Sequence, residues 1–193
     1  EMHEKFDVQI SGGSTTSAIG HALILNDDVA PRTVAPAFNS DPAFLFDASY
    51  YAAKVHDLIP SSTLTIENAL QDFLSQGLGS NWISPTAAFD ASYYESRWAD
   101  LGAQDLDRAT LFAHWNKFGI WEGRAASQAF EHFDGSRYLA DNPDVATYVD
   151  ANISGFLGSR TNGAIAHFVI FGSSEQRVAY DTEGALIEMG YTL

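Results

Sequence analysis

The side chains best suited to chemistry form two sets that follow the same order along the chain. Each set has a histidine followed by a glutamate and an arginine: His114 with Glu122 and Arg124, and His167 with Glu175 and Arg177. Imidazole can bind a metal or sense pH, and a carboxylate beside a guanidinium can serve acid–base catalysis. A zinc site needs three or four ligands close together, and no second ligand lies near either histidine. We therefore expect structural histidines, each packed on the phenylalanine four residues later and bonded to a neighbouring turn.

Aspartates recur in two series that could contribute to calcium sites. The series are Asp47, Asp90 and Asp134, and Asp57, Asp100 and Asp144. Neither has the spacing of an EF-hand loop, so we interpret these residues as helix caps and solvated charges. We assign no metal site and no cofactor, and calcium binding is kept as an alternative.

Four tryptophans could stack on sugar rings if their faces were exposed: Trp82, Trp98, Trp115 and Trp121. At helical spacing such residues are more often part of a core, and we expect that here. The sequence has no serine nucleophile elbow, no phosphate-binding loop and no paired carboxylates with an evident pocket. It therefore predicts a protein that is not an enzyme.

The charge balance restricts the possible partners. Among 193 residues, 25 acidic side chains stand against 10 basic ones, and the net charge is −15. A field of this sign repels phosphate backbones and anionic lipids, so we expect no nucleic-acid binding. No apolar run approaches the roughly 18–20 residues that span a bilayer, so we expect no membrane insertion. The absence of cysteine excludes disulfides and thiolate metal sites.

The line Phe-Asp-Ala-Ser-Tyr-Tyr occurs twice, starting at 46 and at 89, and a looser copy starts at 133. The steps of 43 and 44 residues between these starts mark an internal repeat. The aspartate can cap a helix, because its carboxylate accepts amide protons of the first turn. These structural repeat positions are Phe46, Asp47 and Tyr51; Phe89, Asp90 and Tyr94; and Phe133, Asp134 and Tyr138.

The second half of each repeat predicts a further helix that ends at a glycine. Asp72 takes the place of the two histidines in the first copy. We expect Gly119 and Gly172, like Gly77, to adopt the left-handed conformation that terminates a helix. Arg124 is expected to pair with the aspartate that opens the next repeat and so to hold neighbours in register. For its counterpart Arg177 we expect a structural use.

The sequence predicts an all-α fold of tandem helix–turn–helix repeats packed into one domain, with an extended or partly β N-terminal arm. We place the arm at residues 1–45 and the repeat domain at residues 46–193. Its divisions are unit 1 (about 46–88), unit 2 (about 89–132), unit 3 (about 133–179) and a closing segment (180–193). We expect residues 151–162 to be a loop-like insertion and residues 186–189 to form a short closing helix. Each unit must bury its aromatic face against a neighbour.

The repeat resembles units found in large bacterial secreted and surface proteins. In those units Phe-Asp-x-x-Tyr-Tyr-Leu-x-x-Asn-Pro-Asp-Val precedes His-Phe-x-x-x-Gly-x-x-Glu-Gly-Arg. The matching stretches are residues 133–145, 114–124 and 167–177. Many such proteins also carry RTX-type calcium-binding repeats, adhesin segments or S-layer segments. The glycine-rich nonapeptide that ligates calcium in RTX proteins is absent, so the resemblance does not imply calcium binding.

These observations predict a non-catalytic structural or interaction module of a secreted or cell-surface bacterial protein. Its role would be anchoring, assembly or docking, through a protein partner or through self-association at the cell surface. The alternative is a glycan- or calcium-binding module of a surface adhesin. The resemblance implies an extracellular or cell-surface location.

Overall fold

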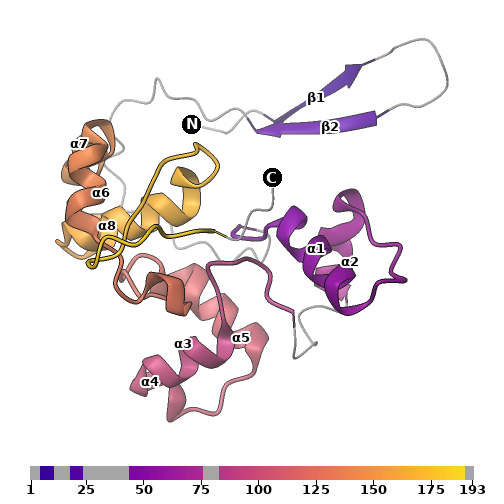
Figure 1. Ribbon diagram of the computed structural model, residues 1–193, viewed down its shortest axis with the longest axis horizontal. Helices are drawn as coiled ribbons and strands as arrows, with labels where there is room; N and C mark the ends of the chain where they lie inside the picture. The colour runs from indigo at the N-terminus through magenta and orange to yellow at the C-terminus, as the bar shows by residue number, and fades with distance from the viewer. Residues whose placement is uncertain (1–4, 11–17, 24–43, 76–82, 190–193) are drawn as a thin grey trace. The chain divides into compact units, whose positions relative to one another are not determined.

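The computed structural model describes residues 5–10, 18–23, 44–75 and 83–189 (Figure 1). The contacts between residues group the chain into two compact units, Glu1–Arg32 and Thr33–Leu193. In the first part, strand β1 (Lys5–Ile10) pairs antiparallel with β2 (Ala18–Leu23), with Lys5 opposite Leu23 and Ile10 opposite Ala18. The parts of the predicted arm at residues 11–17 and 24–43 lie outside the described residues.

The described residues of the second part are helical, which confirms the all-α prediction. They contain eight α-helices together with short 3-10 and π-helical turns. The α-helices are α1 (Ala48–Leu58), α2 (Ile66–Ser75), α3 (Ala91–Arg97), α4 (Ala99–Gly102), α5 (Arg108–His114), α6 (Gly135–Asp141), α7 (Pro143–Ala151) and α8 (Arg160–His167). Within each repeat unit the first helix contacts the last one: α1 contacts α2, α3 contacts α5, and α6 contacts α8.

The opening aspartate of each unit caps the first helix. The carboxylates of Asp47, Asp90 and Asp134 accept the amide protons of the residues three positions later, at 2.9 Å in each case. These bonds satisfy amide groups that have no partner inside the helix. The same three residues also join the ends of their units: the bonds are Asp47 N–H to Pro85 O, Asp90 N–H to Ala126 O and Asp134 N–H to Tyr180 O.

An aromatic set recurs beneath these caps. The opening phenylalanine ring lies against the tyrosine five residues later and also contacts an aromatic ring on the last helix or the turn that follows it. The phenylalanine–tyrosine ring centroids are 5.4 Å apart for Phe46–Tyr51, 5.8 Å for Phe89–Tyr94 and 5.6 Å for Phe133–Tyr138. The third ring is Phe73, Trp115 or Phe168, at 4.9, 5.4 and 5.8 Å from the phenylalanine. Burial of these rings is the main source of stability in each unit.

Two expectations for unit 3 are wrong. Residues 151–162 are not simply a loop, because a 3-10 turn, η4 (Ile153–Phe156), buries Phe156 and α8 already begins at Arg160. Residues 186–189 do not form a helix. Instead Tyr180 bridges to Leu186, and Asp181 bridges to Phe133, so the closing segment folds back on the start of unit 3.

Candidate functional site

The residues with chemical potential lie where the last helix of a unit passes the first. There the buried tyrosine hydroxyl meets a polar side chain: Tyr51 donates to Asp72 Oδ2 at 2.9 Å, Tyr94 lies 3.0 Å from His114 Nδ1, and Tyr138 lies 3.0 Å from His167 Nδ1. Aspartate and histidine thus occupy one structural position and take the same partner. Burial raises the pKa of all three tyrosines, so the hydroxyls stay protonated at neutral pH.

The two histidines are enclosed by aromatic rings. The His114 ring lies 5.5 Å from Phe118, and the His167 ring lies 5.5 Å from Phe171, the residue four positions later in each case. The ring of Tyr148 also lies 6.2 Å from that of His167. Burial lowers the pKa of His114, and it lowers the pKa of His167 to about 4. Both side chains are therefore neutral at pH 7.

The glycines adopt a different role from the one expected. In the tails that follow the last helices, positive φ angles occur at Gly123 (68°) and Gln176 (58°). Gly119 and Gly172 do not have positive φ angles. Gly119 ends the π-helical turn η2 (Trp115–Gly119), and Gly172 ends η5 (Phe168–Gly172). A Cβ at either position would clash with the hydroxyl of Tyr94 or Tyr138. The glycines are therefore required for the close approach of tyrosine, and Gly77 lies outside the described residues.

The arginines bind within their own units, so the expected pairing with the next unit is wrong. Arg124 Nη1 donates to both carboxylate oxygens of Asp100, at 3.0 and 2.8 Å, and its Nε donates to Glu122. The backbone N–H of Arg124 bonds to Gly119 O at 2.9 Å across the π turn. This bond turns the tail back toward α4, where Asp100 lies, instead of onward to the next unit. The same arginine also covers the Trp98 ring, at 4.9 Å from the centroid.

We call this pairing of an arginine with an aspartate and a glutamate of its own unit the clamp. Unit 3 repeats the clamp in a fully bidentate form. Arg177 Nη1 and Nη2 donate to the two Asp144 oxygens at 3.0 and 2.7 Å, and Nε donates to Glu175. Nη1 also donates to Asn142 Oδ1 at 2.9 Å. Asn142 precedes Pro143 at the start of α7, but its side chain makes no cap bond there and serves the arginine and the preceding helix. The hydrogen bonds from Arg177 lower the pKa of Asp144, and those from Arg124 lower the pKa of Asp100.

Unit 1 has neither arginine nor glutamate in its tail, and the consequence is visible at its second aspartate. Asp57 corresponds to Asp100 and Asp144, but its recorded ion pair is an exposed contact with Lys54 at 3.5 Å. The next residue, Leu58, is 54% exposed, whereas the corresponding Leu101 and Val145 are each 1% exposed. The clamp therefore accompanies burial of the aliphatic residue that follows the aspartate.

We expect Arg177→Leu to destabilise unit 3 by about 1 kcal/mol or less, because the clamp is partly exposed and its carboxylates can be solvated. Arg177→Lys should recover little, since a single ammonium cannot reproduce the bidentate fork. Urea denaturation at low and at high salt measures both effects. Wild type and Arg177→Leu should converge at high salt, where the ion pairs are screened. A loss several times larger would mean that the arginine supports more than this pair.

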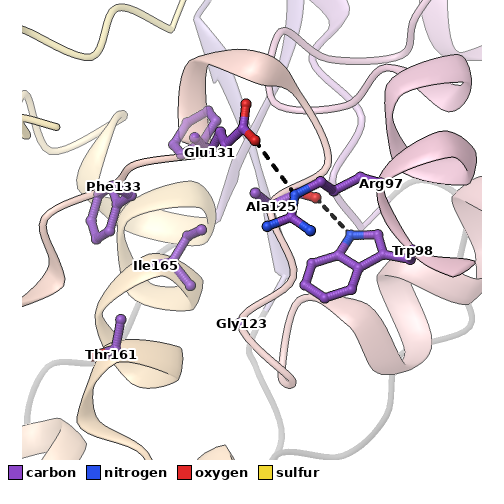
Figure 2. A pocket seen from close by; sticks show the side chains of 9 residues that line it. Arg97, Trp98, Gly123, Ala125, Glu131, Phe133, Thr161 and Ile165 are labelled. Atoms are coloured by element: carbon purple, nitrogen blue, oxygen red, sulfur yellow. Dashed lines mark hydrogen bonds and ion pairs between the residues drawn. The ribbon is translucent and has the colours of Figure 1, made fainter. Parts of the chain in front are cut away.

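One recess lies between units 2 and 3 (Figure 2). Its volume is about 130 Å³, and its lining includes Trp98 of unit 2 and Ile165 of unit 3. Trp98 Nε1 donates to Ala125 O at 3.0 Å, and Arg97 lies 3.6 Å from Glu131, as the dashed lines in Figure 2 show. Arg97 and Glu131 are the charged groups of the recess, and they pair with each other. The lining brings together no nucleophile, base and acid.

The tryptophans within the described residues are core or half-buried. Trp115 is 1% exposed and Trp121 is 9% exposed, and the Nε1 of Trp115 donates to Arg124 O at 3.3 Å. Trp82 lies outside the described part of the chain. In that part, no three histidine or carboxylate side chains are close enough together to hold a metal ion. No helix there is both long and apolar enough to cross a bilayer.

Sequence reasoning found the positions of these side chains but not their partners. The tyrosine–histidine contact joins residues 20 positions apart in unit 2 and 29 apart in unit 3. The one available signal was the alignment of Asp72 with the two histidines, since both side chains can accept a hydrogen bond. Comparison with known protein families, curated proteins and solved structures finds no match for this chain.

Proposed function

We propose that this chain is a non-catalytic structural or interaction module of a secreted or cell-surface bacterial protein, with a role in anchoring, assembly or partner docking. The observation that carries the proposal is the internal use of the repeated histidines and arginines. The histidines face buried tyrosines, and the arginines close on carboxylates of their own units. Catalytic groups would have to be free to meet a substrate.

The exchange of aspartate for histidine supports a structural role further. Asp72 in unit 1 accepts from Tyr51, and an imidazole nitrogen takes the same place beside the tyrosine hydroxyl in the other two units. A carboxylate and a neutral imidazole differ in charge and basicity, so their exchange favours a structural role for that position. Both can accept a hydrogen bond from a phenol, which is all that the buried contact requires.

Protein docking is better supported than binding of glycan or calcium. Stacking on a sugar needs an open aromatic face, whereas Trp115 and Trp121 are buried and a guanidinium covers Trp98. Calcium needs converging carboxylates, whereas Asp100 and Asp144 already bind arginines. The proposed surface location rests on the resemblance of the repeat to units of bacterial surface proteins, and the net charge of −15 accords with a solvated exterior.

The test is binding of the fluorescently labelled full chain to intact cells of the bacterium that encodes it. We expect saturable binding that is lost when the cells are first treated with protease. His114→Asp, which copies the arrangement of unit 1, should bind equally well because its role is structural. No saturable binding would contradict the proposal. Binding that resists protease but is lost after glycosidase treatment would favour the glycan alternative.

A further inference from the structure

The last helices of the three units (α2, α5 and α8) carry one corresponding face, which has very different surroundings in each unit. The face consists of three positions spaced four residues apart, and we call it the leading face. Its members are Ile66, Leu70 and Leu74 on α2; Arg108, Phe112 and Asn116 on α5 and η2; and Thr161, Ile165 and Val169 on α8 and η5. Residues four apart lie on the same side of a helix, so each set forms a continuous strip.

In unit 2 the leading face is covered by unit 1. Phe112 is 2% exposed, and its ring meets Phe73 of unit 1 edge-on, with the centroids 5.9 Å apart. Asn116, one turn further on, is fully buried. This face is therefore part of the junction between the two units.

In unit 3 the leading face is turned toward unit 2. Thr161 and Ile165 line the recess whose opposite wall is Trp98 and Ala125 (Figure 2). The backbone of Gly123 lies so close to Asn162, beside that face, that a Cβ on the glycine would clash with it. Units 2 and 3 thus each place the leading face of their last helix against the unit before.

In unit 1 the leading face is the most apolar of the three, and it is also the most exposed. Ile66 is 56% exposed and Leu74 is 44% exposed, and Leu70 between them is only partly buried. On the adjacent side of α2, Ala69 and Phe73 are buried in the core. Residues 1–45 contain no copy of the repeat that could supply a preceding unit.

An exposed apolar side chain lies at the other end of the repeats, just before the closing segment. In unit 2 the residue after the clamp arginine, Ala125, is 8% exposed and lies in the junction with unit 3. The residue after the clamp arginine of unit 3 is Val178, which is 49% exposed. The side of unit 3 that would receive a following unit therefore carries an exposed valine.

We propose that copies of this chain associate head to tail, with the α2 face of one copy (Ile66, Leu70, Leu74) seated on the Val178 side of unit 3 of the next. This deepens the proposed docking function and rests on it, naming a second copy of the chain as the partner. The contact continues the pattern by which α8 already faces unit 2. Because the two surfaces differ, the association is heterologous and can extend beyond two copies.

Sedimentation velocity on the full chain tests the proposal. We expect reversible association that grows with protein concentration up to about 1 mM. It should strengthen from low to high salt, because salt screens the repulsion between copies of net charge −15 while the apolar contact persists. A chain that stays monomeric throughout would overturn the proposal. The cell-binding experiment would then decide separately whether another protein is the partner.

Two variants with one altered surface each identify the mode of contact. Leu74→Glu blocks the α2 face and Val178→Glu blocks the unit 3 surface. Both side chains are largely exposed, so the fold should be retained, which circular dichroism checks. Each variant alone is expected to be monomeric, and an equimolar mixture should form dimers that grow no further. Leu157→Glu, at an exposed leucine outside both surfaces, should associate like wild type.

The mixture gives the decisive outcome. Dimers in the mixture but not in either variant alone require two different surfaces that bind each other. If Val178→Glu associated by itself, the contact would be symmetric and the head-to-tail arrangement would be wrong. If Leu74→Glu associated by itself, α2 would not be the docking face.

Discussion

Gly119→Ala is expected to destabilise the helical domain by about 3 kcal/mol, a large effect for one methyl group. The added Cβ would occupy the space of the Tyr94 hydroxyl and would lie 3.0 Å from Trp115 Cδ1. Both neighbours are buried rings that cannot move aside without opening the core of unit 2. Urea denaturation followed by circular dichroism measures the change in the free energy of unfolding.

A double substitution separates this clash from a general intolerance of alanine. Tyr94→Phe removes the hydroxyl and leaves His114 without its partner, and it should cost about 1–2 kcal/mol alone. Gly119→Ala with Tyr94→Phe should be less destabilised than the two single effects added together, because the clashing atom is gone. Gly102→Ala, at an exposed helical glycine of α4, is the control and should change stability by less than about 1 kcal/mol. A Gly119→Ala protein as stable as wild type would mean that the hydroxyl lies elsewhere.

Acidification is expected to remove about 3 kcal/mol of stability between pH 6.5 and pH 4, because burial lowers the pKa of His167 from 6.5 to about 4. Between these values the unfolded chain binds a proton on this imidazole and the folded chain does not. Stability from this residue is therefore complete above pH 6.5 and is lost progressively as the pH falls toward 4. His114, whose pKa is also lowered by burial, changes stability in the same direction.

The charged groups around His167 set the competing effects. Glu175 and Asp144 favour its protonated form and Arg177 opposes it, but burial outweighs all three. His167→Gln keeps a hydrogen-bonding group without a proton to gain, so its stability should vary much less over this range. Denaturant midpoints at pH 7, 5.5 and 4 make the comparison. If the denaturant midpoint fell equally with pH in wild type and His167→Gln, this histidine would not be the source of acid sensitivity.

The all-α fold and the helix starts could be predicted because their causes are local. A cap bond spans three residues, so the Phe-Asp line is enough to place the first turn after Asp47, Asp90 and Asp134. The break between α6 and α7 was likewise visible in Asn142-Pro143, because proline cannot continue a helix beyond its first turn. These features depend on a few neighbouring residues, which a sequence pattern contains.

The partners of the arginines and glycines could not be predicted because they depend on the path of the backbone between helices. The π turns after His114 and His167 add one residue per turn and carry Arg124 and Arg177 back over their own units. A pattern of apolar residues does not distinguish this turn from an α-helical end. The predicted role of Gly119 was wrong for the same reason. In a sequence, a glycine before a polar tail looks the same whether it supplies a positive φ or space for a neighbour.

In this structure the residues best suited to chemistry form internal contacts. Nitrogen NMR of the two imidazoles, from pH 8 to pH 4, tests this most directly. We predict that at pH 8 His114 and His167 are each a single neutral tautomer with the proton on Nε2, because Asp72, which takes their place in unit 1, can only accept from its tyrosine. On acidification both rings should titrate below pH 6.5, and His167 only near pH 4. Rapid exchange between tautomers and titration of both rings near pH 6.5 would contradict the account, since the imidazoles would then be open to solvent and available to a ligand.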